Sequence, residues 1–289
     1  MITKAWPKEM RLWKLVSRWD SNLVEAMLKV LTPNQVDSYH RDGLLFPLPA
    51  LSAAEVKYFR ACHDDLDRRL GGRPTAEQKG DSHLYFKWIC DLATHPIVLD
   101  AVEDIIGPDI LIHSSTIFTK YARDEKFVSW HQDSHYWGLS EPRLVSAWIA
   151  LTDSTIDNGC LRALPGTHTR AFEHLEEPQQ TNILSRGHTV YGSLDLNKAV
   201  DIVLLAGQMS FHHANLIHGS KPNTSTGPRI GVAVRYVSTA VRQQKLHIPV
   251  ILARGRDEYH HYRLQERPTA DIEEGVKLSA SRHPASAKF

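Results

Sequence analysis

The amino-acid sequence predicts an α+β fold, mainly β, in which a few helices precede a β-sandwich or barrel. Helix-start signals lie before Gly107, and from Asp109 onward short β-prone runs alternate with turn residues. The 289 residues are 42% hydrophobic and 23% charged, which is enough apolar side chain to bury a sizeable core. We expect one domain that spans residues 1–289.

Three segments carry the sequence signals of helices. Capping-box sequences at 32–35 and 52–55 predict the starts of the first two. These helices should end near Gly43 and at about Gly71, because glycine readily adopts the backbone conformation that ends a helix. The third helix is expected over residues 96–106, between a proline and a glycine.

Six later segments have the composition and alternation of strands. They are residues 110–122, 127–133, 144–153, 201–207, 208–219 and 229–237. Residues 1–31 are expected to form an additional amphipathic helix, and residues 32–237 the helices plus the β core. Residues 238–289 are expected to form a charged, histidine-rich segment that ends in a loose tail.

Charge and cysteine content exclude several classes of protein. The net charge is +1 with neutral histidines, so there is no basic field for nucleic acid or an acidic membrane surface. No apolar run approaches the roughly 20 residues that cross a bilayer, and the first residues do not resemble a secretory leader. Cys62, Cys90 and Cys160 form no Cys-x-x-Cys pair, which favours free thiols. These observations predict a cytoplasmic protein.

Histidine is abundant, with 17 copies, and the pattern His-x-Asp occurs at 40–42, 63–65 and 131–133. A non-haem iron(II) site needs two histidines and one carboxylate on one side of the ion. Residues two apart point to different faces of a helix but to the same face of a strand. Only His131 and Asp133 lie in a predicted strand, so they are the candidate ligand pair.

A third ligand has to come from a distant strand, and His212, His213 and His218 compete for this role. His218 precedes a turn, and Arg229 follows eleven residues later at the start of the next predicted strand. Arginine offers a planar two-point contact to a carboxylate, such as the distal carboxylate of 2-oxoglutarate. This spacing favours His218 and predicts an iron(II) oxygenase that uses 2-oxoglutarate and O₂.

The ordered motifs resemble the phytanoyl-CoA dioxygenase family. The resemblance covers residues 32–237 and is carried by HRDGLLFPLPALSAAEV, TKYARDEKFVSWHQDSHYW, NGCLRALPGTH and HGSKPNTSTGPRIGVAVRY. It implies a double-stranded β-helix (jelly-roll, cupin-like) core with flanking N-terminal helices. It also implies dependence on Fe(II) and 2-oxoglutarate, with succinate, CO₂ and an oxidised substrate as products.

The resemblance also implies roles for single residues. His131, Asp133 and His218 match the metal ligands of the family. Arg229 matches the arginine that binds the C5 carboxylate of 2-oxoglutarate. Further matches to co-substrate contacts are Ser220, Trp148 and Lys87. Halogenating relatives replace the carboxylate ligand by alanine or glycine, so Asp133 indicates a hydroxylase.

The expected substrate is a small molecule, either free or bound to a carrier. An acyl-CoA is not assumed, because the sequence has no evident Lys/Arg cluster for the phosphates of coenzyme A. We expect a tailoring hydroxylase of secondary metabolism. Aromatic residues beside the ligand strand either line the substrate pocket or pack the core: Trp130, His135 and Trp137. Arg235 shares the strand parity of Arg229, so it should face inward and meet an acidic side chain or an anionic substrate.

Two other functions are compatible with the sequence. A cupin-like metalloenzyme could use the same three ligands without 2-oxoglutarate, and Arg229 and Ser220 would then have no co-substrate to bind. A non-catalytic jelly-roll protein could hold structural zinc, although such sites usually have four protein ligands and often cysteine. Formation of succinate separates the first alternative from the oxygenase, and the metal content after purification separates the second.

Overall fold

The computed structural model describes residues 28–72, 80–135, 137–184, 186–244 and 248–271. The predicted helix within residues 1–31 lies almost entirely outside the described residues, and the tail over residues 277–289 lies wholly outside them. No helix in the described ranges is long and apolar enough to cross a membrane. The single-domain boundaries stay a prediction.

The helices of the described chain precede most of the strands, as predicted. The α-helices are α3 (Pro33–Asp42), α4 (Ala53–Arg69), α6 (Lys87–Ala93) and α7 (Pro96–Ile106), and short 3-10 helices lie among the strands. Both capping boxes are present, because the Thr32 and Ser52 side chains each accept the backbone N–H three residues later. Helix α6 was not predicted, and its start at Phe86 has no side-chain cap that could have signalled it.

Among the described residues, the strands form two main sheets and a two-stranded ribbon. The large sheet has the order β1-β9-β4-β11-β2-β12-β13, the small sheet the order β3-β10-β5-β8, and the ribbon pairs β6 with β7. The strand bounds are β1 Leu44–Pro49, β2 Ile110–Lys120, β3 Val128–His131, β4 Leu144–Ala150, β5 Leu161–Ala163, β6 His174–Glu176, β7 His188–Val190, β8 Val200–Ile202, β9 Gln208–His213, β10 His218–Ser220, β11 Arg229–Ser238, β12 Pro249–Arg254 and β13 Arg263–Leu264. This is the predicted double-stranded β-helix with flanking helices.

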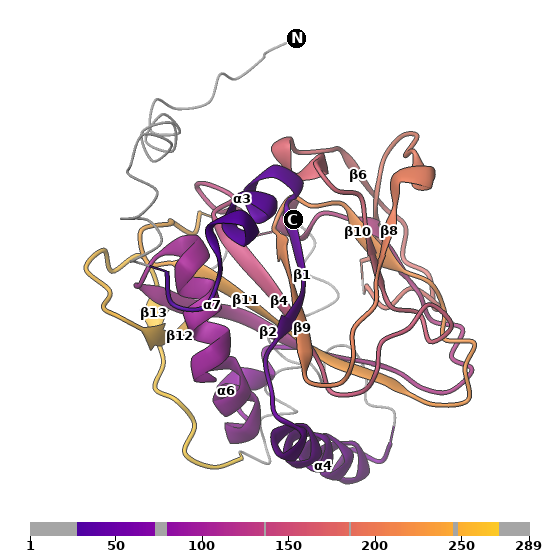
Figure 1. Ribbon diagram of the computed structural model, residues 1–289, viewed down its shortest axis with the longest axis horizontal. Coiled ribbons are helices and arrows are strands. Elements are labelled where there is room, and N and C mark those ends of the chain that lie inside the picture. Colours follow the sequence, from indigo (N-terminus) through magenta and orange to yellow (C-terminus); the bar gives the residue numbers. More distant parts are fainter. Residues whose placement is uncertain (1–27, 73–79, 136, 185, 245–247, 272–289) are drawn as a thin grey trace.

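Strand β11 contributes side chains both to the hydrophobic core and to the pocket between the sheets. All of its residues are buried, and the alternation of a strand gives it two different faces. Val232 and Val234 belong to the main core, together with residues of α6 and α7, which lie against the large sheet (Figure 1). Ala233 and Arg235 point the other way and line a pocket between the sheets.

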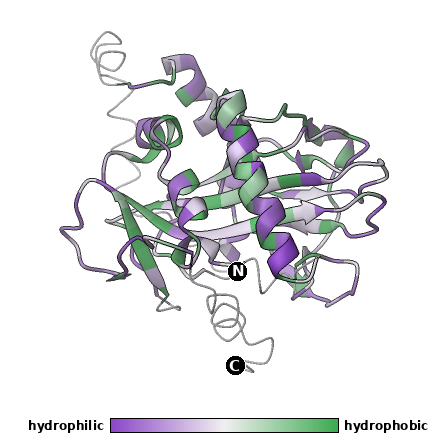
Figure 2. Cartoon of the chain, turned by 90° about the horizontal axis from the view of Figure 1, so that it is seen from below, coloured by the Kyte–Doolittle hydropathy of each residue, from purple (hydrophilic) through white to green (hydrophobic). Residues whose placement is uncertain are grey.

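The hydropathy of the chain agrees with this layering. In Figure 2 the hydrophobic residues gather on the strands and on parts of the helices that cover them, and hydrophilic residues occupy most of the connecting loops. The burial of apolar side chains against the large sheet is the main stabilising contribution to such a fold. One face of the large sheet therefore packs in the hydrophobic core, and the opposite face lines the pocket between the sheets.

Several strand predictions were wrong in extent, and some strands were not predicted. Residues 208–219 form β9 and β10, in different sheets, because the chain turns between them: the Leu216 N–H donates to the His213 carbonyl at 2.8 Å. Of residues 201–207, only the first two lie in a strand, β8. The segment after residue 237 contributes β12, which pairs with β2.

Candidate metal centre

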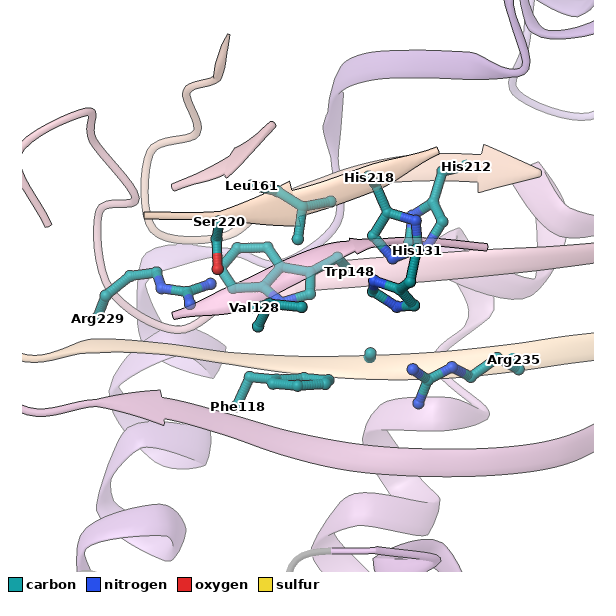
Figure 3. Close-up of a pocket in the computed structure, with 11 residues that line it drawn as sticks. Phe118, Val128, His131, Trp148, Leu161, His212, His218, Ser220, Arg229 and Arg235 are labelled. Atoms are coloured by element: carbon teal, nitrogen blue, oxygen red, sulfur yellow. The ribbon is translucent and has the colours of Figure 1, made fainter. Parts of the chain in front are cut away.

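A pocket lies between the two main sheets. Strands β2, β4, β9 and β11 of the large sheet and β3, β5 and β10 of the small sheet supply its lining residues. Figure 3 shows Arg229 and Ser220 at one end, and three histidine rings and Arg235 toward the other. The site is thus assembled from strands that are far apart in the sequence.

Three buried side chains form a potential metal site, and two of them, His131 and His218, line this pocket. His218 on β10 is the direct cross-strand partner of His131 on β3, and their ring centroids are 4.2 Å apart. Nε2 of His131 lies 3.5 Å from Oδ1 of Asp133. One ligand atom from each of the three residues lies within 4.8 Å of the others, and in the described chain no other group of this kind occurs.

The local structure of Asp133 differs from the prediction of one strand over 127–133. Strand β3 ends at His131, and Asp133 begins the short 3-10 helix η3 (Asp133–His135). The chain leaves the sheet because the Ser134 N–H donates to the Ala214 carbonyl, at 3.0 Å, in the turn after β9. The Asp133 carboxylate is still directed toward His131, because its Oδ2 accepts a hydrogen bond from Ser146 Oγ at 2.9 Å.

Backbone carbonyls fix the orientation of both histidine ligands. Nδ1 of His131 lies 2.9 Å from the Ser129 carbonyl, and Nδ1 of His218 lies 3.0 Å from the Leu216 carbonyl. A carbonyl only accepts hydrogen bonds, so each Nδ1 carries the proton and each Nε2 keeps its lone pair. Two oriented imidazole nitrogens and one carboxylate oxygen fit a divalent iron ion.

The electrostatics favour the protonation states that a metal requires. Burial alone would raise the pKa of Asp133, but the charge of Arg235 and the nearby imidazoles of His131 and His212 hold it well below its usual range. Burial, with the neighbouring His131, holds the pKa of His218 well below its ordinary value. The centre therefore offers an ionised carboxylate beside a neutral imidazole, as metal binding requires.

Arg229 marks the opposite end of the pocket. Its side chain is 1% exposed, and among the described residues no carboxylate lies within ion-pair distance of it. Its Nε and Nη1 atoms are buried without hydrogen-bond partners, and the guanidinium lies 5.1 Å from the Trp148 ring. Burial lowers the pKa of Arg229 to about 10, so it remains charged at neutral pH. An uncompensated buried cation of this kind favours an anionic ligand.

Ser220 also lines this end of the pocket, and a buried lysine stands behind it. Lys120 Nζ donates to Ser220 Oγ at 2.6 Å and also bonds the Lys221 carbonyl. Lys120 was not predicted as a site residue, because only its pairing with Arg229 across β2 and β11 places it here. Lys87 does not reach the pocket: it is exposed on α6 and pairs with Asp91 at 2.6 Å. Its expected contact with 2-oxoglutarate is therefore withdrawn.

The structure separates the other candidate residues. Trp130 packs in a small cluster away from the pocket, because it neighbours His131 on a strand and points to the opposite face. The His135 ring stacks on His174, with centroids 4.2 Å apart, and does not line the pocket. The Trp137 ring lies 5.8 Å from the Arg235 guanidinium.

Of the two adjacent histidines on β9, the structure places only one in the site. His212 lines the pocket, and its Nε2 lies 3.5 Å from Oδ2 of Asp133. His213 points away and contacts the His168 ring, with centroids 5.1 Å apart. Sequence alternation predicts that the two point apart, but it does not say which one faces inward.

Several known proteins are similar to this chain in sequence or in structure. Ectoine dioxygenase from Bordetella bronchiseptica is 28% identical over 236 residues, which cover 72% of this chain and 76% of that protein. The apo structure of the non-heme monooxygenase ThoJ matches with a TM-score of 0.75 at 30% identity, over 86% of this chain and 95% of that one. The structure of CytC3 with Fe(II) and alpha-ketoglutarate matches with a TM-score of 0.60 at 25% identity, over 81% and 93%.

The enzyme that gives its name to the matching family model is similar over a shorter region. Peroxisomal phytanoyl-CoA dioxygenase from Bos taurus is 34% identical over 151 residues, which are 50% of this chain. The match spans only 44% of the length of that enzyme. The family model for phytanoyl-CoA dioxygenase matches residues 39–231, which contain the whole His131/Asp133/His218 centre and Arg229. The chain therefore belongs to the phytanoyl-CoA dioxygenase family.

Proposed function

We propose that this protein is an Fe(II)- and 2-oxoglutarate-dependent dioxygenase that hydroxylates a C–H bond of a small-molecule substrate. The observation that carries the proposal is Arg229, a buried cation with no carboxylate partner in the described chain, in the same pocket as the His131/Asp133/His218 centre. When bound, iron with 2-oxoglutarate and O₂ supplies the oxidising power, and succinate and CO₂ are released.

The metal and the co-substrate carboxylate bind at opposite ends of the pocket. Two Nε2 atoms and the Asp133 carboxylate hold the metal, and Arg229 with Ser220 binds the distal carboxylate of the co-substrate. Trp148 forms the wall against which the Arg229 guanidinium lies. Because the lining residues other than half-buried Phe118 are buried between the two sheets, water is largely excluded and the charged contacts are strengthened.

Hydroxylation is the reaction that we propose, since Asp133 provides the carboxylate ligand that halogenating relatives replace. Oxidation of a small molecule is supported by the similarity to an ectoine dioxygenase and to a monooxygenase. We also propose a cytoplasmic location, supported by three free cysteines, of which Cys90 and Cys160 are buried.

Two alternative functions explain fewer of the observations. A cupin-like metalloenzyme without 2-oxoglutarate would leave the charge of Arg229 buried and uncompensated, at a large free-energy cost. A structural zinc site would need a closed set of four ligands, and the ligand cluster found in the described chain has three members and no cysteine. Three ligands on one side leave room for a co-substrate.

The proposal is tested by adding 2-oxoglutarate to the Fe(II)-loaded protein without O₂. We expect the visible charge-transfer band of a chelated keto acid. Arg229→Gln should need at least about tenfold more 2-oxoglutarate to form it, because a charge-assisted contact is lost. Arg242→Gln, a change at an exposed arginine, is the matched control. Iron binding without a band in the unmodified protein would contradict the assignment of the co-substrate.

A further inference from the structure

The pocket contains a second buried arginine that the co-substrate does not require. Arg235 is 8% exposed and lies on β11, like Arg229. Both side chains line the pocket, and in Figure 3 the two guanidinium groups enter it from opposite ends. The histidine rings lie close to the Arg235 end.

The contacts of Arg235 hold one edge of its guanidinium and leave another edge open. Nη1 donates to Thr116 Oγ1 at 2.9 Å. The guanidinium carbon lies 5.8 Å from the Trp137 ring and 6.0 Å from the Phe118 ring, so two aromatic side chains flank the group. Within the described chain, Nη2 makes no hydrogen bond, and it is not among the fully enclosed atoms. A ligand in the pocket can therefore accept from Nη2.

The charge of Arg235 is compensated only by a residue that the metal also needs. Among the described residues, Asp133 is the one carboxylate at ion-pair distance, with 3.6 Å between Nε and Oδ2. In the loaded site the two charges of Fe(II), the negative charge of Asp133, the two negative charges of 2-oxoglutarate and the charge of Arg229 sum to zero while Lys120 is neutral, and to one positive charge when Lys120 is protonated. The charge of Arg235 is then left over, in a site where an unpaired ion is costly.

His212 adds a second polar group on the same side of the pocket. It is 2% exposed, and neither of its ring nitrogens makes a hydrogen bond of normal geometry. We propose that Arg235, with His212 beside it, binds an oxyanion of the substrate, in the simplest case a carboxylate. The inference rests on the proposed function and extends it to a substrate class: the oxidised molecule is an anion held next to the metal.

Matched pairs of acids and amides test this inference. The protein is loaded with Fe(II) and saturating 2-oxoglutarate without O₂ and is titrated with benzoate or benzamide, and with phenylacetate or phenylacetamide. The perturbation of the charge-transfer band and the tryptophan fluorescence report binding. We expect the acid of at least one pair to bind about tenfold or more tightly than its amide. Arg235→Gln should abolish this preference, and Arg235→Lys, which keeps the charge, should retain part of it.

The outcomes separate this inference from the proposed function. No band in the unmodified protein contradicts the proposed function before any acid is added. A normal band without an acid preference in any pair, or a preference that survives in Arg235→Gln, overturns the inference alone. Arg235→Gln should still bind Fe(II) and form the band. Loss of Fe(II) binding or of the band in Arg235→Gln would show that Arg235 supports Asp133 or binds 2-oxoglutarate, and would also overturn the inference.

Discussion

Arg229 and Lys120 are direct partners across the antiparallel strands β11 and β2, and their side chains are 1% and 0% exposed. Burial and the neighbouring charge of Arg229 lower the pKa of Lys120 to about 6. Lys120 Nζ donates to Ser220 Oγ at 2.6 Å, which leaves the hydroxyl hydrogen of Ser220 for a ligand. The co-substrate end of the pocket is therefore an anion site with one member that titrates near neutral pH.

The first prediction is that 2-oxoglutarate binding weakens as the pH rises above about 6, the pKa of Lys120. A bound carboxylate raises the pKa of the neighbouring lysine. Above pH 6 or so, binding therefore requires the uptake of a proton, and the apparent Kd should rise by up to about tenfold per pH unit. Anaerobic titrations of the charge-transfer band across this pH range measure the effect.

A matched pair of lysine variants controls this pH dependence. Lys120→Met should flatten the dependence, because the titrating group is removed. Lys87→Met should keep the full slope, because Lys87 is exposed and pairs with Asp91 away from the pocket. An unchanged slope in Lys120→Met would show that another group binds the proton.

The second prediction concerns the hydrogen bond that orients the carboxylate ligand. Ser146 is fully buried, and its Oγ lies 2.9 Å from Oδ2 of Asp133. Ser146→Ala should weaken Fe(II) binding by roughly 10- to 100-fold, as is typical when the partner of a metal ligand is removed. Ser210→Ala is the control, since Ser210 is equally buried but its hydroxyl has no hydrogen-bond partner. Equal metal affinity in both variants would argue against a role for Ser146.

The third prediction concerns the close approach of Gly231 and Trp148. A Cβ atom added at Gly231 would lie 2.1 Å from the Trp148 ring, so the ring would have to move. Gly231→Ala should lower the free energy of unfolding by about 1–3 kcal/mol and weaken 2-oxoglutarate binding, because the wall beneath Arg229 shifts. Urea unfolding and band titration measure the two effects. Gly227→Ala, where a Cβ meets nothing within 4 Å, should change neither quantity.

The fourth prediction is a loss of stability in acid that originates at His83. Burial lowers the pKa of His83 from 6.5 to about 4, and Nδ1 lies 2.9 Å from Ser115 Oγ. Below pH 6.5 the unfolded chain binds more protons at this site than the folded chain does. The contribution is therefore complete above pH 6.5 and is lost as the pH falls, by roughly 3 kcal/mol at pH 4.

Unfolding free energies measured against pH check this contribution. His83→Gln should have a shallower decline in acid than the unmodified protein. His260→Gln, a change at an exposed histidine, should decline as steeply as the unmodified protein. Parallel curves for all three proteins would show that the acid sensitivity originates elsewhere.

The helices show which features are predictable from local sequence. Helix α3 begins after the Thr32 cap and ends at Gly43, whose φ of 70° suits glycine, and α7 spans the predicted residues 96–106. These signals lie within a few residues of the ends that they define. Helix α6 has no such signal, and the break between β9 and β10 depends on contacts with a different sheet. Both were therefore missed.

The sequence by itself determined the chemistry that was available: a His-x-Asp pair, a later histidine and an arginine at a fixed spacing predict an iron and 2-oxoglutarate site. Only the tertiary structure decided that Lys120, rather than Lys87, lies at the co-substrate end of the pocket, and that the acidic partner of the inward-facing Arg235 is Asp133. The physical reason is that these contacts depend on the pairing register of strands distant in the sequence. Register is set by the packing of the whole core, which no local pattern specifies.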